Sequence, residues 1–296
     1  MQLSCADYSW PLLEHPHVIA LIQALGLEGV DIGFFGNRSH LRPEVVRQDV
    51  RYWAGVVTER VERAGLKVAD LFYQPWSDFA RMAANHPDPQ EQAESDELFH
   101  TVIEFALGVG APGITMLPGL VLPGETPATS IEHSATKLRQ RVQECGAVGL
   151  RLSVEGHLGS NVDSPAKLGD LVAQTPGLGL TLDYTHYISL GFTEDEIEPL
   201  QAHASHVQLR GAAPGRLQAN YGDSTIDHFR LINGLRQRGY DSWIGFEYVW
   251  QDWMECNRSD NLSETIMLRD LVVAALRGEP YTPPPGAAVG PSPRDR

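Results

Sequence analysis

Along most of this chain, the arrangement of apolar residues alternates between two patterns. Short apolar runs, typical of buried strands, are each followed by a longer stretch in which apolar residues recur every three or four positions. One such stretch begins at Pro43, a residue that favours the first turn of a helix, and its apolar residues from Val46 to Val61 predict one buried stripe. This regular change of period predicts strands that alternate with helices.

The pattern gives eight strand-then-helix units. The expected strands are residues 3–6, 29–35, 66–72, 113–119, 150–156, 178–184, 205–211 and 243–248. The expected helices are residues 15–27, 43–65, 88–108, 130–145, 164–176, 193–204, 224–240 and 263–279. Eight parallel strands close a sheet into a barrel, so we predict an α/β fold of the (β/α)8 TIM-barrel type. An open doubly wound sheet is less favoured, because the chain has no GxGxxG after the first strand and no GxxxxGK[ST].

The length of the chain agrees with one barrel, and its composition disfavours two kinds of partner. The chain has 296 residues, and residues 1–278 suit a single catalytic barrel, followed by a Pro-rich tail at 279–296 that we expect to be extended or disordered. A formal net charge of -15 disfavours nucleic acid and anionic membrane as partners. The chain contains no run of about 18 apolar residues, so we expect no membrane span. The three cysteines form no CxxC pair, so we expect reduced thiols and a cytoplasmic location.

Polar residues gather at the carboxyl ends of the last four predicted strands. In a barrel these ends face one opening, where the long loops at residues 74–89 and 118–129 are also expected to shape a substrate pocket. The polar residues at these strand ends are Glu155, His157, Asp183, His186, His206, Gln208, Arg210 and Glu247.

Four of these residues offer oxygen donors from four successive strands, which suits a hard divalent cation. We expect Glu155, Asp183, Gln208 and Glu247 to bind Mn²⁺ or Mg²⁺, with Co²⁺ or Zn²⁺ as alternatives. Gln208 is a weak ligand type, and His206 on the same face of the strand is the alternative ligand. Arg210 is expected either to bind a substrate edge or to form a salt bridge with an acidic neighbour. His157 is expected to contact substrate or to stabilise its loop.

The segments VEGHLGSNVDSPAKLGDLVAQTPGLGLTLDYTHY, SHVQLRGAAPGR and YDSWIGFEY resemble the sugar phosphate isomerase/epimerase superfamily of xylose-isomerase-like barrels, nearest to its hydroxypyruvate isomerase-like members. The similarity covers about residues 150–248. It implies that Glu155, Asp183, Gln208 and Glu247 hold the metal, that Glu155 and Glu247 also form the acid/base pair, and that His186 binds substrate oxygens. Many epimerases have a histidine where Gln208 stands, so the chain departs from the ketose 3-epimerases.

Residues and resemblance together predict a divalent-metal-dependent sugar isomerase or epimerase. It would move a proton beside the carbonyl of a small sugar-like substrate through a metal-stabilised enediolate. A lyase or dehydratase on the same barrel, similar to inosose or dehydroshikimate dehydratases or to C-glycoside-cleaving enzymes, is the second hypothesis, and a non-catalytic binding subunit is the third. Barrels of this type often pair, so the prediction is compatible with a homo-oligomer.

Overall fold

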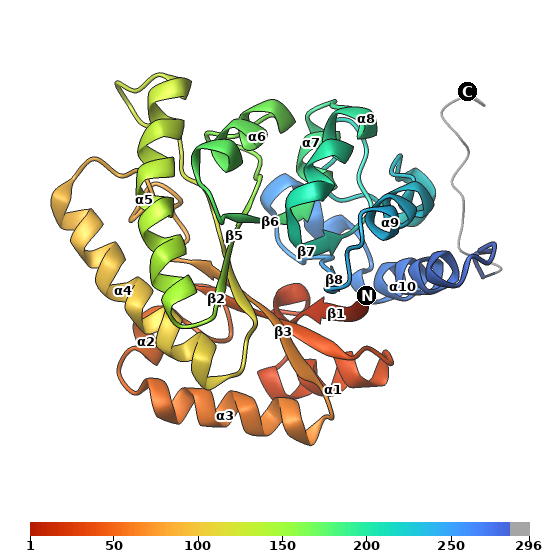
Figure 1. The fold of residues 1–296 in the computed structure, drawn as a ribbon. Coiled ribbons are helices and arrows are strands. Elements are labelled where there is room, and N and C mark those ends of the chain that lie inside the picture. The colour runs from red at the N-terminus through yellow and green to blue at the C-terminus, as the bar shows by residue number, and fades with distance from the viewer. Residues whose placement is uncertain (285–296) are drawn as a thin grey trace.

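A computed structural model describes residues 1–284, and these residues form a closed barrel of parallel strands. The strands follow one another around the barrel in chain order, and β1 pairs with β8 to close it (Figure 1). The strands are β1 Gln2–Ala6, β2 Gly29–Phe35, β3 Lys67–Gln74, β4 Gly113–Met116, β5 Arg151–Glu155, β6 Gly179–Asp183, β7 Ala204–Leu209 and β8 Trp243–Phe246. The predicted TIM barrel is therefore confirmed.

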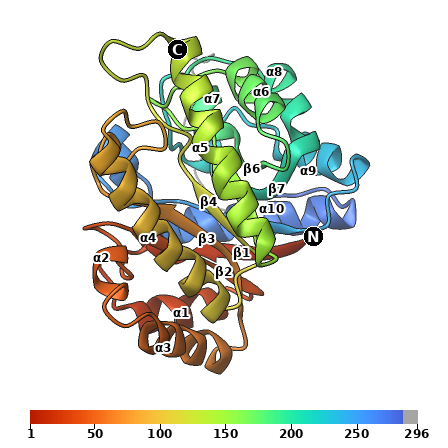
Figure 2. The same cartoon turned by 60° about the vertical axis from the view of Figure 1, so that its left-hand side comes forward.

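Helices connect successive strands and cover the outside of the barrel. Figure 2 shows α4 and α5 lying across the outer side of the strands in the first half of the chain. The α-helices are α1 His15–Ala24, α2 Pro43–Val46, α3 Val50–Arg63, α4 Pro89–Gly108, α5 Pro127–Ala147, α6 Pro165–Gln174, α7 Tyr184–Ser189, α8 Glu194–Ile197, α9 His228–Gln237 and α10 Asn261–Arg277. Short 3-10 helices are η1 Asp7–Ser9, η2 Glu198–His203, η3 Tyr221–Asp223 and η4 Trp253–Arg258.

Two predicted helices are each broken into two pieces. The stretch at residues 43–65 is α2 followed by α3, because Asp49 leaves the helical conformation and its side chain caps α3 by accepting the Tyr52 N–H at 3.0 Å. The stretch at residues 193–204 is α8 followed by η2, where Pro199 supplies no backbone N–H to continue an α-helix.

The inside of the barrel carries a polar layer. His206 lies 3.0 Å from Asp31 through its Nε2 and that carboxylate's Oδ2, and the Ser4 hydroxyl donates to Asp31 Oδ1 at 2.7 Å. A Cβ on Gly245 would lie 1.9 Å from Asp31 Oδ2, so only glycine leaves room for this carboxylate. Alternate residues of a strand share a face, so Gln208 stands one layer above His206, at the mouth of the barrel.

The end of the chain is described only in part. Tyr281 packs its ring against Tyr221, with ring centroids 5.8 Å apart, while residues 285–296 of the predicted tail lie outside the described residues. Among residues 1–284, no helix is long and apolar enough to cross a membrane.

Candidate active site

A cavity of about 290 Å³ opens at the carboxyl ends of the strands. Its polar lining includes Glu155, His157, His186, Arg210 and Glu247, and aromatic side chains from β2, β3 and the loop after β8 form part of its wall. The loops at residues 74–89 and 118–129 contribute less to it than expected. Most of their lining residues face a second, smaller cavity beside His157, and the loop after β8 takes their place.

Three buried carboxylates lie close together, and two of them, Glu155 and Glu247, line the cavity. Glu155 ends β5, Asp183 ends β6 and Glu247 follows β8, and one oxygen from each lies within 4.8 Å of the other two. Burial and the charges of Glu247 and Asp183 raise the pKa of Glu155 well above its usual value. Burial also raises the pKa of Glu247 to about 7, although the charge of Arg210 opposes the shift.

The start of α7 fixes the orientation of Asp183. Its Oδ1 accepts the Thr185 N–H at 2.8 Å and the Thr185 hydroxyl at 2.7 Å, as a helix N-cap does. Its Oδ2 therefore remains for the centre of the cluster. The short helix α7 was not predicted, because it follows β6 without a loop.

Gln208 joins this cluster through Tyr8, a residue that the sequence pattern did not single out. Tyr8, in η1 directly after β1, donates its hydroxyl proton to Glu247 Oε1 at 2.8 Å and accepts the Gln208 Nε2–H at 2.9 Å. Gln208 Nε2 is also 3.4 Å from Glu247 Oε1. Applying the strand-end argument to the first strand would have drawn attention to Tyr8.

A second unanticipated residue, Arg38, lines the cavity from the loop after β2. Its Nη2 donates to Gln74 Oε1 at 2.6 Å, and its guanidinium lies 4.8 Å from the centre of the Phe35 ring. Burial lowers the pKa of Arg38, although nearby acidic groups oppose the shift.

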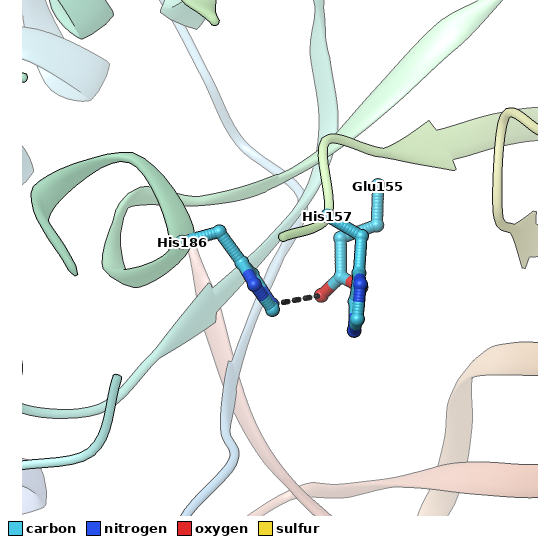
Figure 3. Close-up of side chains that lie close together, drawn as sticks. All are labelled: Glu155, His157 and His186. Carbon is cyan, nitrogen blue, oxygen red and sulfur yellow. Dashed lines mark ion pairs between the residues drawn. The ribbon is translucent and has the colours of Figure 1, made fainter. Parts of the chain in front are cut away.

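Two histidines, His157 and His186, lie close to Glu155 (Figure 3). His186 Nε2 is 3.8 Å from Glu155 Oε1 and 3.5 Å from Asp183 Oδ2, while its Nδ1 accepts the Leu158 N–H at 3.0 Å. The His157 ring lies 4.2 Å from that of His186, and its Nδ1 donates to the Leu158 carbonyl at 2.7 Å. His157 thus makes a loop hydrogen bond and also lines the cavity.

Arg210 and His206 occupy different layers. Arg210 Nη2 lies 3.0 Å from Asp183 Oδ2 and 3.5 Å from Glu247 Oε2, and although burial opposes its charge, these carboxylates raise its pKa. His206, the alternative metal ligand, lies in the layer below and pairs with Asp31. Two residues of a strand span roughly 6–7 Å, so His206 does not reach the level of the cluster through the same face as Gln208.

The donor set at the cavity floor fits a divalent cation. Among the described residues, Glu155 Oε1, Glu247 Oε2 and Gln208 Oε1 are buried and have no hydrogen-bond partner. Buried acceptors without a partner destabilise a protein by about 1–3 kcal/mol each, unless a bound group satisfies them. Carboxylate and amide oxygens are ligands that Mg²⁺ and Mn²⁺ prefer.

The family model described as "Xylose isomerase-like TIM barrel" matches residues 19–271. The chain belongs to this family. As a xylose isomerase-like barrel, it has curated relatives that are named isomerases. It is 24% identical over 212 residues to the 2-oxo-tetronate isomerase of Pectobacterium atrosepticum, which covers 67% of this chain and 77% of the relative. It is 27% identical over 272 residues to the putative hydroxypyruvate isomerase of Streptomyces coelicolor, which covers 84% and 89%.

Solved structures of several activities share the fold of this xylose isomerase-like barrel. An L-ribulose 3-epimerase superposes with a TM-score of 0.72 at 18% identity, covering 94% of this chain and 95% of the other. IOLI protein with a binding zinc atom gives 0.72 at 14% identity, covering 95% and 100%. The probable 3-DHS dehydratase AsbF from Bacillus anthracis gives 0.68 at 12% identity, covering 91% and 99%. These likenesses concern the fold alone.

Proposed function

We propose that the protein is a divalent-metal-dependent isomerase or epimerase that moves a proton on the carbon beside the carbonyl of a small polyhydroxy compound. The observation that carries the proposal is the set of buried oxygens without a hydrogen-bond partner on Glu155, Gln208 and Glu247. Glu155 and Glu247 line the cavity, and Asp183 lies beside them. The isomerase names of the curated relatives support the same reaction class.

Glu155 and Glu247 are the proton-transfer groups in this proposal. A general acid or base works best when its pKa lies near the working pH, and in the metal-free protein burial raises the pKa of Glu247 toward that range, to about 7. One glutamate removes the proton from the substrate carbon, and the other returns a proton to the neighbouring carbon or to the opposite side of the same one. Tyr8 holds Glu247 in place through the bond to Oε1.

In this proposal the two glutamates and the other polar residues of the site also bind the cation or the substrate. Glu155, Asp183, Gln208 and Glu247 would hold Mn²⁺ or Mg²⁺, which would supply Lewis-acid stabilisation of the negative charge that develops on substrate oxygens. The zinc atom bound in the IOLI protein supports a divalent cation in a barrel of this fold. His157 and His186 line the cavity and bind substrate oxygens, while the aromatic wall packs against the carbon face.

Hydrogen exchange tests the proposal. The manganese-loaded protein is incubated in deuterated water with hydroxypyruvate and a panel of ketoses, inososes and C-glycosides. We expect deuterium to enter the carbon beside the carbonyl of at least one substrate, and Glu155→Gln or Glu247→Gln to slow this exchange by about 100-fold or more. Glu132→Gln, on the exposed side of α5, is the matched control and should leave the rate unchanged. If none of these compounds takes up deuterium, the mechanism is refuted.

A lyase is the second candidate, because loss of a β-substituent from the same enediolate gives elimination instead of isomerisation. The fold shared with the probable dehydratase keeps this outcome open. Product analysis of the same incubations separates the two: an isomer of equal mass supports the isomerase, and a product lighter by water or by a sugar supports the lyase. A binding subunit without turnover is the third candidate, and the presence of both Glu155 and Glu247 at the cavity argues against it.

A further inference from the structure

Arg210 reaches into the centre of the carboxylate cluster instead of only lining the cavity. It follows β7, and the residue is 3% exposed. Its Nη2 contacts Asp183 Oδ2 at 3.0 Å and Glu247 Oε2 at 3.5 Å, and its Nε donates to the Thr185 hydroxyl at 3.1 Å. One guanidinium therefore neutralises part of the charge of three clustered carboxylates.

The guanidinium and a divalent cation need the same oxygens. Asp183 has a single oxygen for the centre, because Thr185 already occupies Oδ1, and Arg210 holds that oxygen. Glu247 Oε2, which has no hydrogen-bond partner, also faces the guanidinium. A cation bound to these oxygens at about 2 Å would lie so close to the guanidinium that the two positive charges would repel each other.

The contact with His186 shows that the guanidinium is not well accommodated in this position. The Leu158 N–H donates to His186 Nδ1, so in the neutral ring the proton belongs on Nε2. Nε2–H then faces Arg210 Nη2 at 3.3 Å, and two donors oppose each other.

We propose that Arg210 is the resident counter-cation of the metal-free site and that a divalent cation displaces it from Asp183 and Glu247. The displaced guanidinium turns into the cavity that it already lines, where it binds an oxygen-rich or anionic edge of the substrate. This inference rests on the metal site of the proposed function. It adds that the cation competes with a side chain of the protein for its own ligands.

Manganese binding tests the displacement without reference to activity. Isothermal titration calorimetry measures the Mn²⁺ dissociation constant of the chelator-treated wild type and of Arg210→Met. Since coupling between two competing groups typically changes affinity by about 5- to 150-fold, we expect Mn²⁺ to bind Arg210→Met about tenfold more tightly or better. Arg238→Met, which removes an equal charge from an exposed position after α9, is the matched control and should change affinity less than about twofold.

A second, more conservative variant keeps the displacement testable if Arg210→Met does not fold. Arg210→Lys keeps the charge but loses the bond from Nε to Thr185, so its Mn²⁺ affinity should fall between the other two. Equal or weaker binding by Arg210→Met overturns the displacement and leaves the proposed function standing. Failure of both the wild type and Arg210→Met to bind Mn²⁺ overturns the inference and the metal dependence together.

Discussion

Tyr8 shows how one side chain orients both a proposed metal ligand, Gln208, and a proposed base, Glu247. Its hydroxyl donates to Glu247 Oε1 and accepts from Gln208 Nε2, so it keeps the other oxygen of each group, Glu247 Oε2 and Gln208 Oε1, free of hydrogen bonds. A phenol that donates to a carboxylate both orients it and stabilises its charged form. Tyr8 is therefore a positioning residue for Glu247.

Replacing Tyr8 tests this role at the residue scale. Hydrogen bonds to charged groups contribute about 1.5–3 kcal/mol, so Tyr8→Phe should slow deuterium exchange by about 10- to 100-fold while the protein stays folded. Tyr52→Phe changes an exposed phenol on α3 and serves as the control. If the two variants exchange at the same rate, Glu247 does not depend on Tyr8.

At the scale of elements, the break between α2 and α3 depends on a single cap. The Asp49 carboxylate accepts the Tyr52 N–H, which has no partner within the first turn of α3. Asp49→Ala should lower the free energy of unfolding by about 0.5–2 kcal/mol, measured by chemical denaturation. Glu62→Ala, an exposed change near the other end of α3, should be close to neutral. A loss for Asp49→Ala no larger than that of the control would mean that the cap contributes nothing.

At the scale of the whole molecule, the polar interior of the barrel makes stability depend on pH. Asp70 on β3 is buried, and its Oδ2 has no hydrogen-bond partner among the described residues. Burial raises the pKa of Asp70 to about 6 from 3.8, although His206 and Thr115 oppose the shift. The folded state therefore binds this proton more tightly than the unfolded chain does. Stability is lost as pH rises from about 4 through 6.

Asp70→Asn, which stays neutral at every pH, tests this linkage. At pH 8 the variant should be more stable than the wild type by roughly 1–3 kcal/mol, since each pKa unit corresponds to about 1.4 kcal/mol. The difference should shrink as the pH falls from about 6 to about 4. Denaturant titrations of both proteins across this range measure it, and a difference that is constant with pH would contradict the assignment to Asp70.

The barrel could be predicted from the sequence because the switch from strand-like to helix-like spacing of apolar residues recurs in all eight units. Eight such units are what closes a parallel sheet into a barrel. The strand-end argument also selected Glu155, Asp183, Gln208 and Glu247, which the structure brings to one place. The sequence left open whether Arg210 points into the cavity or toward the carboxylates, since the direction of a long side chain depends on its three-dimensional surroundings. The apolar stripe of residues 43–65 continues through the break at Asp49, so periodicity does not reveal it.

The hydrogen bond between Tyr8 and Glu247 links the first strand of the barrel to the last, because Tyr8 follows β1 and Glu247 follows β8. During synthesis Tyr8 is made long before Glu247. A growing chain that has already formed its first six strands carries Glu155 and Asp183 but lacks Gln208, Arg210 and Glu247. The proposed ligand set is thus complete only after closure, and uptake of a divalent cation would then report that the barrel has been finished.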